Sequence, residues 1–203
     1  METKVITITR QFGSLGRVIA RQVAERLGFE YYDRDIIEAA AEKMGEDVYG
    51  LLEYEGNAVS PYRKMMAPLG YGVSAKQKKL FEIEKGIILD MAGKKDCVIV
   101  GRCSDYILSR ENKKSLFNVF VYAPYSKRFN FCVNSLGLIP EAVEEYMGKV
   151  DAARQAFYKR QTGENFDSIK YRHMMIDSSF LSMCDVVDLI CESAKKKFKE
   201  QEG

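Results

Sequence analysis

The chain has 203 residues, of which 46% are apolar and 30% charged, and a formal net charge of +2; it has five cysteines without a CxxC pair and one histidine. These values predict one globular domain with a full core and disfavour a nucleic acid polymer as partner, a zinc cluster and a disulfide-stapled secreted fold. Without a signal-peptide pattern or a stretch long enough to cross a membrane, we expect a cytoplasmic protein with reduced thiols.

Five short apolar or β-branched runs favour strands. They are residues 5–9, 29–32, 97–100, 117–122 and 174–176. Apolar residues at helical spacing predict helices between and after these runs. The helical stretches are residues 18–27, 36–44, 80–91, 126–159 with a break near Gly137 and Pro140, and a last one from Val186 that we expect to fray from Lys195 onward.

Short strands that alternate with helices predict an α/β fold. We expect a single domain over residues 1–203, built as a three-layer parallel sheet with helices on both faces. In such sheets ligands bind beyond the carboxyl ends of the strands. The residues that directly follow each strand are therefore the candidates for a functional site.

The turn after the first strand, residues 10–17, is suited to bind phosphate. Gly13 and Gly16 let the backbone bend tightly and bring its N–H groups close to an anion. The N-terminus of the following helix adds partial positive charge. Arg10, Ser14 and Arg17 supply further donors. An ordinary strand–helix connection is the alternative interpretation of a GxxG turn.

Several pieces of the chain together resemble the cytidylate-kinase-like family, a branch of the P-loop nucleoside monophosphate kinases. The pieces are residues 6–17, 27–34, 98–103, 151–154 and 171–178. The resemblance implies a P-loop kinase-like fold with a helical lid at residues 126–165 and a mobile acceptor-binding insert at residues 45–79. It also implies ATP with Mg²⁺ as the phosphate donor and a nucleoside monophosphate such as CMP or dCMP as the acceptor.

The turn departs from the standard phosphate-binding pattern GxxxxGK[ST]. In an alignment without gaps, Gly16 stands at the lysine position and Arg17 at the hydroxyl position. Arg10 and Arg17 are the candidates to replace the lysine's charge, and Ser14 is the candidate to replace the hydroxyl. We therefore assign the donor phosphates to Arg10, Gly13, Ser14, Gly16 and Arg17.

The resemblance places the acceptor at the ends of the second and third strands. Asp33 matches an aspartate that contacts the acceptor nucleotide, and Arg34 beside it is included as a candidate although the family usually has a small residue there. Arg102 matches the arginine of a Gly-Arg-Asp element that binds cytidine monophosphate, while Cys103 replaces the aspartate of that element. The structural alternatives are a helix cap for Asp33 and a local acidic partner for Arg102.

Arg17, Arg128 and Arg154 are the catalytic candidates, because arginines that close over a phosphoryl group stabilise the charge of its transition state. For Arg128 and Arg154 a solvated helix face with i,i+3 charge pairs is the alternative. The leading hypothesis is transfer of the ATP γ-phosphoryl to a small acceptor. The alternatives are a nucleotide-binding regulatory module without catalysis and a kinase for a non-nucleotide acceptor; no protein-bound metal site is expected, and the oligomeric state is open.

Overall fold

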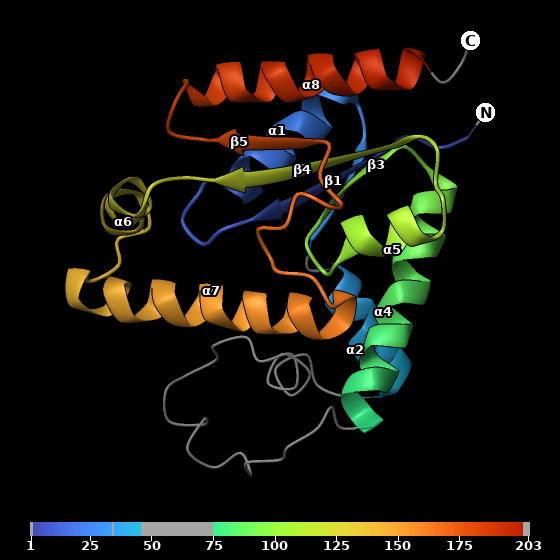
Figure 1. Ribbon diagram of the computed structural model, residues 1–203, viewed down its shortest axis with the longest axis horizontal. Coiled ribbons are helices and arrows are strands. Elements are labelled where there is room, and N and C mark those ends of the chain that lie inside the picture. Colours follow the sequence, from blue (N-terminus) through green and yellow to red (C-terminus); the bar gives the residue numbers. More distant parts are fainter. Residues whose placement is uncertain (1, 34, 46–74, 201–203) are drawn as a thin grey trace.

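The computed structural model describes residues 2–33, 35–45 and 75–200. It contains one sheet of five strands: β1 (Val5–Arg10), β2 (Glu30–Tyr32), β3 (Cys97–Val100), β4 (Leu116–Tyr122) and β5 (Met174–Asp177). Their order is β2-β3-β1-β4-β5, and every neighbouring pair is parallel. The arrowheads of β4 and β5 point to the left in Figure 1, so the carboxyl ends of the strands meet at that edge.

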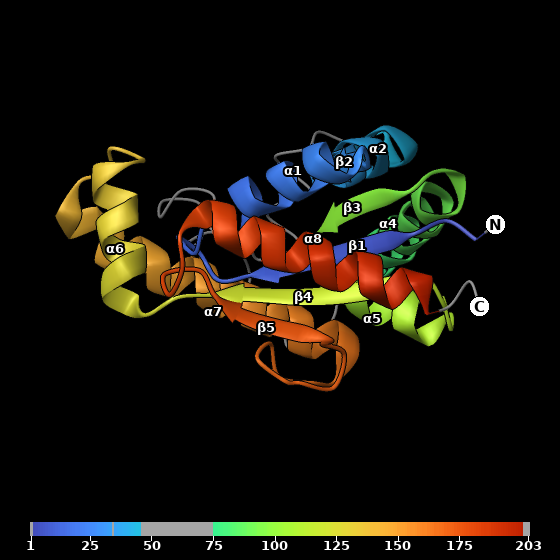
Figure 2. The same cartoon turned by 90° about the horizontal axis from the view of Figure 1, so that it is seen from above.

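Helices cover both faces of the sheet, as predicted for a three-layer fold. One face carries α1 (Gly16–Leu27) and α8 (Met183–Lys199), which contact each other and lie side by side in Figure 2. The other face carries α2 (Asp35–Met44), α4 (Ala75–Lys94), α5 (Ser104–Arg110) and α7 (Pro140–Thr162), below the strands in Figure 1. Helix α6 (Tyr125–Asn134) follows β4 at the carboxyl edge.

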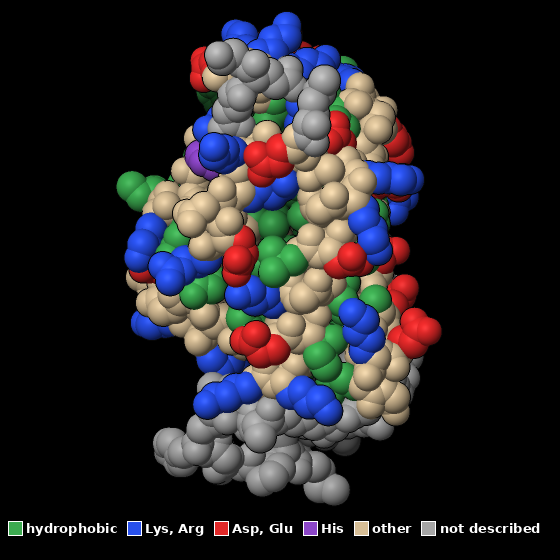
Figure 3. Space-filling view, turned by 90° about the vertical axis from the view of Figure 1, so that its right-hand side faces the viewer, with side chains coloured by type: hydrophobic (Ala, Val, Ile, Leu, Met, Phe, Trp, Pro, Cys, Tyr) green, Lys and Arg blue, Asp and Glu red, His purple; other side chains and the backbone are tan. Residues whose placement is uncertain are grey.

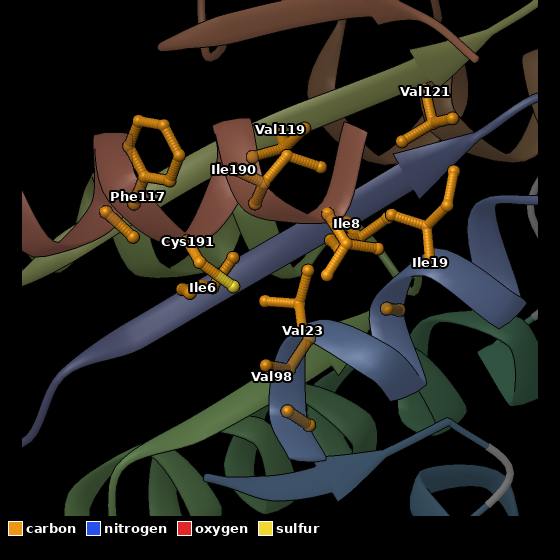
Figure 4. Close-up of a cluster of buried hydrophobic side chains, with 14 of the residues drawn as sticks. Ile6, Ile8, Ile19, Val23, Val98, Phe117, Val119, Val121, Ile190 and Cys191 are labelled. Carbon is orange, nitrogen blue, oxygen red and sulfur yellow. The ribbon is translucent and has the colours of Figure 1, made fainter. Parts of the chain in front are cut away.

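Two apolar clusters fill the spaces between these layers. In the first, Ile6 and Ile8 of β1 pack with Val23 of α1 and Ile190 of α8 (Figure 4). In the second, on the other face, Val5 and other strand residues pack against α2, α4 and α5. Because side chains alternate along a strand, β1 supplies both clusters. The three central strands β1, β3 and β4 are therefore buried on both faces, which explains their continuous apolar runs, whereas the edge strands β2 and β5 keep exposed residues.

The ends of α1 and α8 and the helix α5 compare differently with the prediction. Gly28 ends α1 in a left-handed conformation with φ of 68°, as the predicted stop requires. The predicted fraying from Lys195 is wrong for the described residues, because α8 continues to Lys199. Phe198 lies four residues after Ala194 and is only 4% exposed, so it extends the buried stripe of this helix. The short helix α5 was not predicted, since seven residues are too few for a clear period.

The sequence predicted an acceptor-side segment at residues 45–79 and a lid region at residues 126–165. The structure describes a small part of the first segment and all of the second region. Of the predicted acceptor-side segment, only Gly45 and residues 75–79 are described, and the latter form the start of α4. The predicted lid region contains α6 and α7, and α7 buries Val143, Met147 and Tyr158. Within the described ranges, no helix is long and apolar enough to cross a membrane.

Candidate active site

The turn between β1 and α1 lies at the carboxyl edge of the central strand. Gly13 has φ of +74°, and a Cβ there would lie 3.0 Å from both the Arg128 carbonyl oxygen and Cys132 Sγ, so glycine lets the turn press against α6. Leu15 is also left-handed, with φ of 62°, directly before α1 begins. In the part of the chain that the structure describes, the backbone N–H groups of residues 13–17 have no hydrogen-bond partner. Together with the N-terminus of α1 they present hydrogen-bond donors of the kind that suits an anion.

The Ser14 side chain has a structural role in this turn. Its buried hydroxyl donates to the carbonyl oxygens of Gln11 and Val121, at 3.0 and 3.1 Å. Ser178, after β5, donates its hydroxyl to the Ser14 carbonyl oxygen at 2.8 Å and was not identified as part of the site from sequence. The Ser14 hydroxyl thus fixes the turn to the sheet, and the Ser14 N–H is the group left for a ligand.

Arg10, the last residue of β1, extends its side chain across the carboxyl edge. A Cβ added at Gly16 would lie 2.5 Å from Arg10 Cβ, and one at Gly101 would overlap Arg10 Nη1. The side chain therefore runs from the start of α1 to the end of β3, over two glycines. Burial lowers the pKa of Arg10; Asp33 opposes this shift and the charge of Arg17 adds to it.

Asp33, directly after β2, lies between two arginines. Its Oδ2 is 2.7 Å from Arg17 Nε, and its Oδ1 is 3.7 Å from Arg10 Nη2. The Arg17 side chain is 51% exposed and that of Asp33 is 13% exposed. Residues predicted for the donor and the acceptor thus meet in one cluster. The predicted acceptor residue Arg34 lies outside the described residues.

Arg102 follows β3 within three consecutive left-handed residues, Gly101 to Cys103, with φ of 78°, 55° and 54°. This conformation costs a non-glycine residue about 1–2 kcal/mol, and such strain is frequent at functional sites. Arg102 Nη1 lies 3.3 Å from Glu84 Oε1. Burial, followed by the charge of Arg10, lowers the pKa of Arg102 to about 10. The local acidic partner considered for Arg102 is therefore Glu84.

Glu84 itself was missed by the sequence interpretation. It lies on α4 with no exposed surface, and burial raises its pKa to about 8. Within the described residues neither carboxyl oxygen has a hydrogen-bond partner. Leu80 and Ile88 flank it one helical turn away on each side. A carboxylate inside the apolar stripe of a helix was the signal that could have identified it.

Helix α7 supplies Arg154, and a nearby aspartate fixes the turn. Arg154 Nη1 donates to the Arg10 carbonyl oxygen at 3.2 Å, and its guanidinium lies 5.9 Å from the centroid of the Phe12 ring. Burial, followed by the charge of Arg10, lowers the pKa of Arg154 to about 9. Asp151 Oδ1 accepts the backbone N–H of Phe12 at 2.8 Å. Asp151 therefore connects α7 to the backbone of the turn after β1.

Arg128 uses its hydrogen-bond donors on groups of the protein itself. Its Nε donates to the Ala123 carbonyl oxygen at 3.1 Å, and its Nη1 donates to the Phe12 carbonyl oxygen at 2.9 Å and to Asp151 Oδ2 at 2.6 Å. The structure thus places this predicted catalytic residue behind the turn, where it holds the backbone in position.

Four arginines from separate parts of the chain concentrate positive charge at this edge. They are Arg10, Arg17, Arg102 and Arg154. The charge of Arg10 is itself a cause of the lowered pKa values of Arg102 and Arg154, so these groups repel one another. At the opposite end of the molecule, in Figure 3, basic and acidic side chains are interspersed. A bound anion would relieve the repulsion within the cluster.

Comparison with known proteins agrees with this geometry. The model of the cytidylate kinase-like family matches residues 5–180. The chain belongs to the cytidylate kinase-like family. Its parallel sheet and the turn after β1 form the P-loop kinase fold of this family, as the resemblance in sequence implied. No curated protein matches the chain.

Solved structures share this fold with the cytidylate kinase-like chain at low sequence identity. An uncharacterized protein from Eubacterium ventriosum has a TM-score of 0.69 at 17% identity, covering 95% of this chain and 99% of that one. Shikimate kinase from Acinetobacter baumannii, in complex with shikimate, has a TM-score of 0.54 at 15% identity, covering 96% and 94%. A gluconokinase from Sinorhizobium meliloti has a TM-score of 0.56 at 11% identity, covering 98% and 95%. These similarities establish the fold.

Proposed function

We propose that this member of the cytidylate kinase-like family transfers the γ-phosphoryl group of ATP to a small phosphate-bearing acceptor, with a nucleoside monophosphate such as CMP or dCMP as the leading candidate. The observation that supports it is the convergence of Arg10, Arg17, Arg102 and Arg154 beside the N–H groups of the turn, which have no partner among the described residues. Phosphoryl transfer depends mainly on positioning and on stabilising charge, and this arrangement supplies both without a nucleophilic side chain.

The positions of the residues divide the work between donor and acceptor. The backbone of residues 13–17 and Arg17 bind the phosphates of the donor. Arg102 and Asp33, at the ends of β3 and β2, face the acceptor. An oxygen of the acceptor phosphate attacks the γ-phosphorus, the bond to the bridging oxygen breaks, and ADP leaves. Arg154 stabilises the charge that spreads over the transferred group.

The described residues fit a polyphosphate better than a protein-bound metal. Arg10 Nε is buried and has no hydrogen-bond partner in the described part of the chain, and it can bind a phosphate oxygen. Arg17 stands where the standard turn has its Mg²⁺-binding hydroxyl, and in the described ranges no group of three acidic, histidine or cysteine residues is arranged for a metal ion. Mg²⁺ would therefore arrive with the nucleotide, held by its phosphates, and neutralise part of their charge.

The test is ADP formation from ATP and Mg²⁺ with CMP, dCMP, UMP or AMP as acceptor, preceded by thermal-shift measurements of each ligand. We expect one monophosphate to support turnover and R154A to reduce it by about 100-fold. R110A is the matched control, since Arg110 is exposed at the end of α5. The proposal is wrong if ATP and a monophosphate both bind while no ADP forms.

That last outcome would favour the second candidate, a nucleotide-binding module without catalysis. Gly16 at the lysine position and Arg17 at the hydroxyl position motivate it. Cys103, which stands in place of the family's aspartate, motivates a different acceptor instead. For that reason the acceptor panel also contains shikimate and gluconate, the acceptors that the names of the structural neighbours suggest.

A further inference from the structure

Arg10 and Gly16 occupy exchanged positions relative to the standard phosphate-binding turn. The pattern GxxxxGK[ST] has a glycine at its first position and a lysine at its seventh, whereas this chain has Arg10 first and Gly16 seventh. A Cβ at Gly16 would lie 2.5 Å from Arg10 Cβ and 2.9 Å from Arg10 Cγ. Side chains at these two positions therefore compete for the same space, and only one of them can be long.

We propose that Arg10 replaces the lysine as the cation that binds the transferred phosphoryl group, and that Gly16 and Gly101 are glycines because they make room for its side chain. This assignment rests on the proposed function, since it names the residue that performs one of its steps. It also chooses Arg10 over Arg17, the two candidates for the lysine's replacement that the sequence left open.

The Arg10 guanidinium has unused hydrogen-bonding capacity. Its side chain is 14% exposed, its nearest acidic partner is Asp33 at 3.7 Å, and its buried Nε has no hydrogen-bond partner within the described residues. Arg128, by contrast, donates to two carbonyl oxygens and to Asp151. A buried donor without an acceptor is costly, and a phosphate oxygen would remove this cost. Arg10 can therefore bind a ligand, whereas Arg128 stabilises the backbone of the turn.

The backbone of Arg10 is held firmly enough to aim this side chain. Arg10 pairs with Val121 at the end of β1, and its carbonyl oxygen accepts a hydrogen bond from Arg154. The side chain then crosses from the turn toward Gly101, next to Arg102. The guanidinium thus lies between the backbone assigned to the donor phosphates and the residues assigned to the acceptor, where the phosphoryl group passes.

The test compares R10G, G16K and the double variant R10G/G16K by calorimetric titration with MgATP, MgADP and inorganic tripolyphosphate. We expect R10G to weaken MgATP binding by about tenfold or more and MgADP binding less, because the lost contact is to the terminal phosphate. G16K alone should also weaken binding, since its side chain collides with Arg10. The double variant should bind MgATP more tightly than R10G, because a lysine at position 16 can now enter the vacated space.

Several controls separate the possible results. R10Q, which keeps the side-chain carbons to Cδ and removes the charged guanidinium, tests whether R10G acts through folding, and R110A should bind as the unmodified chain does. The assignment is overturned if R10G and R10Q bind MgATP normally. It is also overturned if the effects of R10G and G16K on the binding free energy of MgATP are additive in the double variant. MgATP binding that depends on Arg10 without any turnover would support the assignment and contradict only the proposed transfer. A chain that binds neither MgATP nor tripolyphosphate contradicts both.

Discussion

Asp33 and Arg17 form an ion pair with 2.7 Å between Oδ2 and Nε, in which the Arg17 side chain is half exposed. The second oxygen of Asp33 faces Arg10 at 3.7 Å. Among the described contacts of these two arginines, Asp33 is the acidic side chain that balances their charge. A phosphate that binds here would share these arginines with Asp33 or take them from it.

The variant D33N should make the cluster more dependent on a bound anion. Without the carboxylate, repulsion between Arg10 and Arg17 is no longer balanced, so we expect a lower melting temperature in phosphate-free buffer and a larger rise on adding pyrophosphate than in the unmodified chain. Differential scanning fluorimetry measures both. D90N is the control, because Asp90 forms an exposed pair with Lys94 on α4, and such pairs contribute little. An unchanged response to pyrophosphate in D33N would show that Asp33 does not balance the cluster.

The contacts of Asp151 predict a loss of stability in D151N. Asp151 accepts the Phe12 N–H and pairs with Arg128, and both carboxylate and guanidinium are largely buried. Removing its charge leaves Arg128 poorly compensated, so we expect a decrease of about 2 kcal/mol in the free energy of unfolding. Urea denaturation measures this, and E145Q on the same helix is the control, since Glu145 forms an exposed pair with Lys149. Equal stability of the two variants would contradict the role given to Asp151.

The general location of the site could be predicted from the sequence because it follows from local patterns. β-Branched runs predicted the strands and glycines indicated the turn. Parallel strands bring their carboxyl ends to one edge of the sheet. These patterns place Asp33, Arg102 and the turn at strand ends, while the roles predicted for Asp33 and Arg102 came from the family resemblance; the structure brings Asp33 into contact with Arg10 and Arg17.

The pairing of charges at the site could not be predicted in the same way. Arg128 and Arg154 look alike in the sequence, yet one holds the backbone of the turn and the other lies beside Arg10. Their roles depend on the direction of each side chain after α6 and α7 pack against the turn. Glu84 was missed for a related reason, since a charged residue in a helix is normally exposed.

The buried pair of Asp105 and Arg172 predicts strongly non-additive stability effects. Both side chains are at most 1% exposed, and the Tyr158 hydroxyl donates to Asp105 Oδ2 at 3.1 Å. The Arg172 guanidinium also lies 5.4 and 5.1 Å from the ring centroids of Phe120 and Tyr158. Removing one partner leaves a buried charge, so D105N and R172M should each lower the free energy of unfolding by about 3–5 kcal/mol.

The double variant D105N/R172M should be more stable than the sum of the two single losses predicts, because neither partner is then left as an unpaired buried charge. Urea denaturation of all four proteins gives the coupling energy. Strict additivity of the two losses would contradict a direct pair. Tyr158, on α7, makes the same network a connection between α7 and α5.

Glu84 predicts how stability changes with pH. Burial raises the pKa of its carboxyl from 4.5 to about 8, so between these values the folded chain holds a proton that the unfolded chain has lost. The corresponding stabilisation is complete below the unfolded pKa and is lost as the pH rises through the folded pKa, by at most about 1.4 kcal/mol per pH unit. In E84Q the free energy of unfolding should therefore fall less steeply between about pH 5 and 8 than in the unmodified chain. E82Q, at an exposed position of the same helix, should not change this slope.

The same proton connects Glu84 to ligand binding through Arg102, which lies 3.3 Å away. Below about pH 8 a neutral Glu84 does not compete with a phosphate for the charge of Arg102, whereas an ionised Glu84 does. Monophosphate affinity should therefore decrease as the pH rises from about 7 to 9 in the unmodified chain and stay nearly constant in E84Q. Titration calorimetry at each pH measures this difference. Parallel stability curves and parallel affinity curves for the two proteins would mean that Arg102 keeps Glu84 ionised throughout, and that the pair is a fixed support for the strained turn after β3.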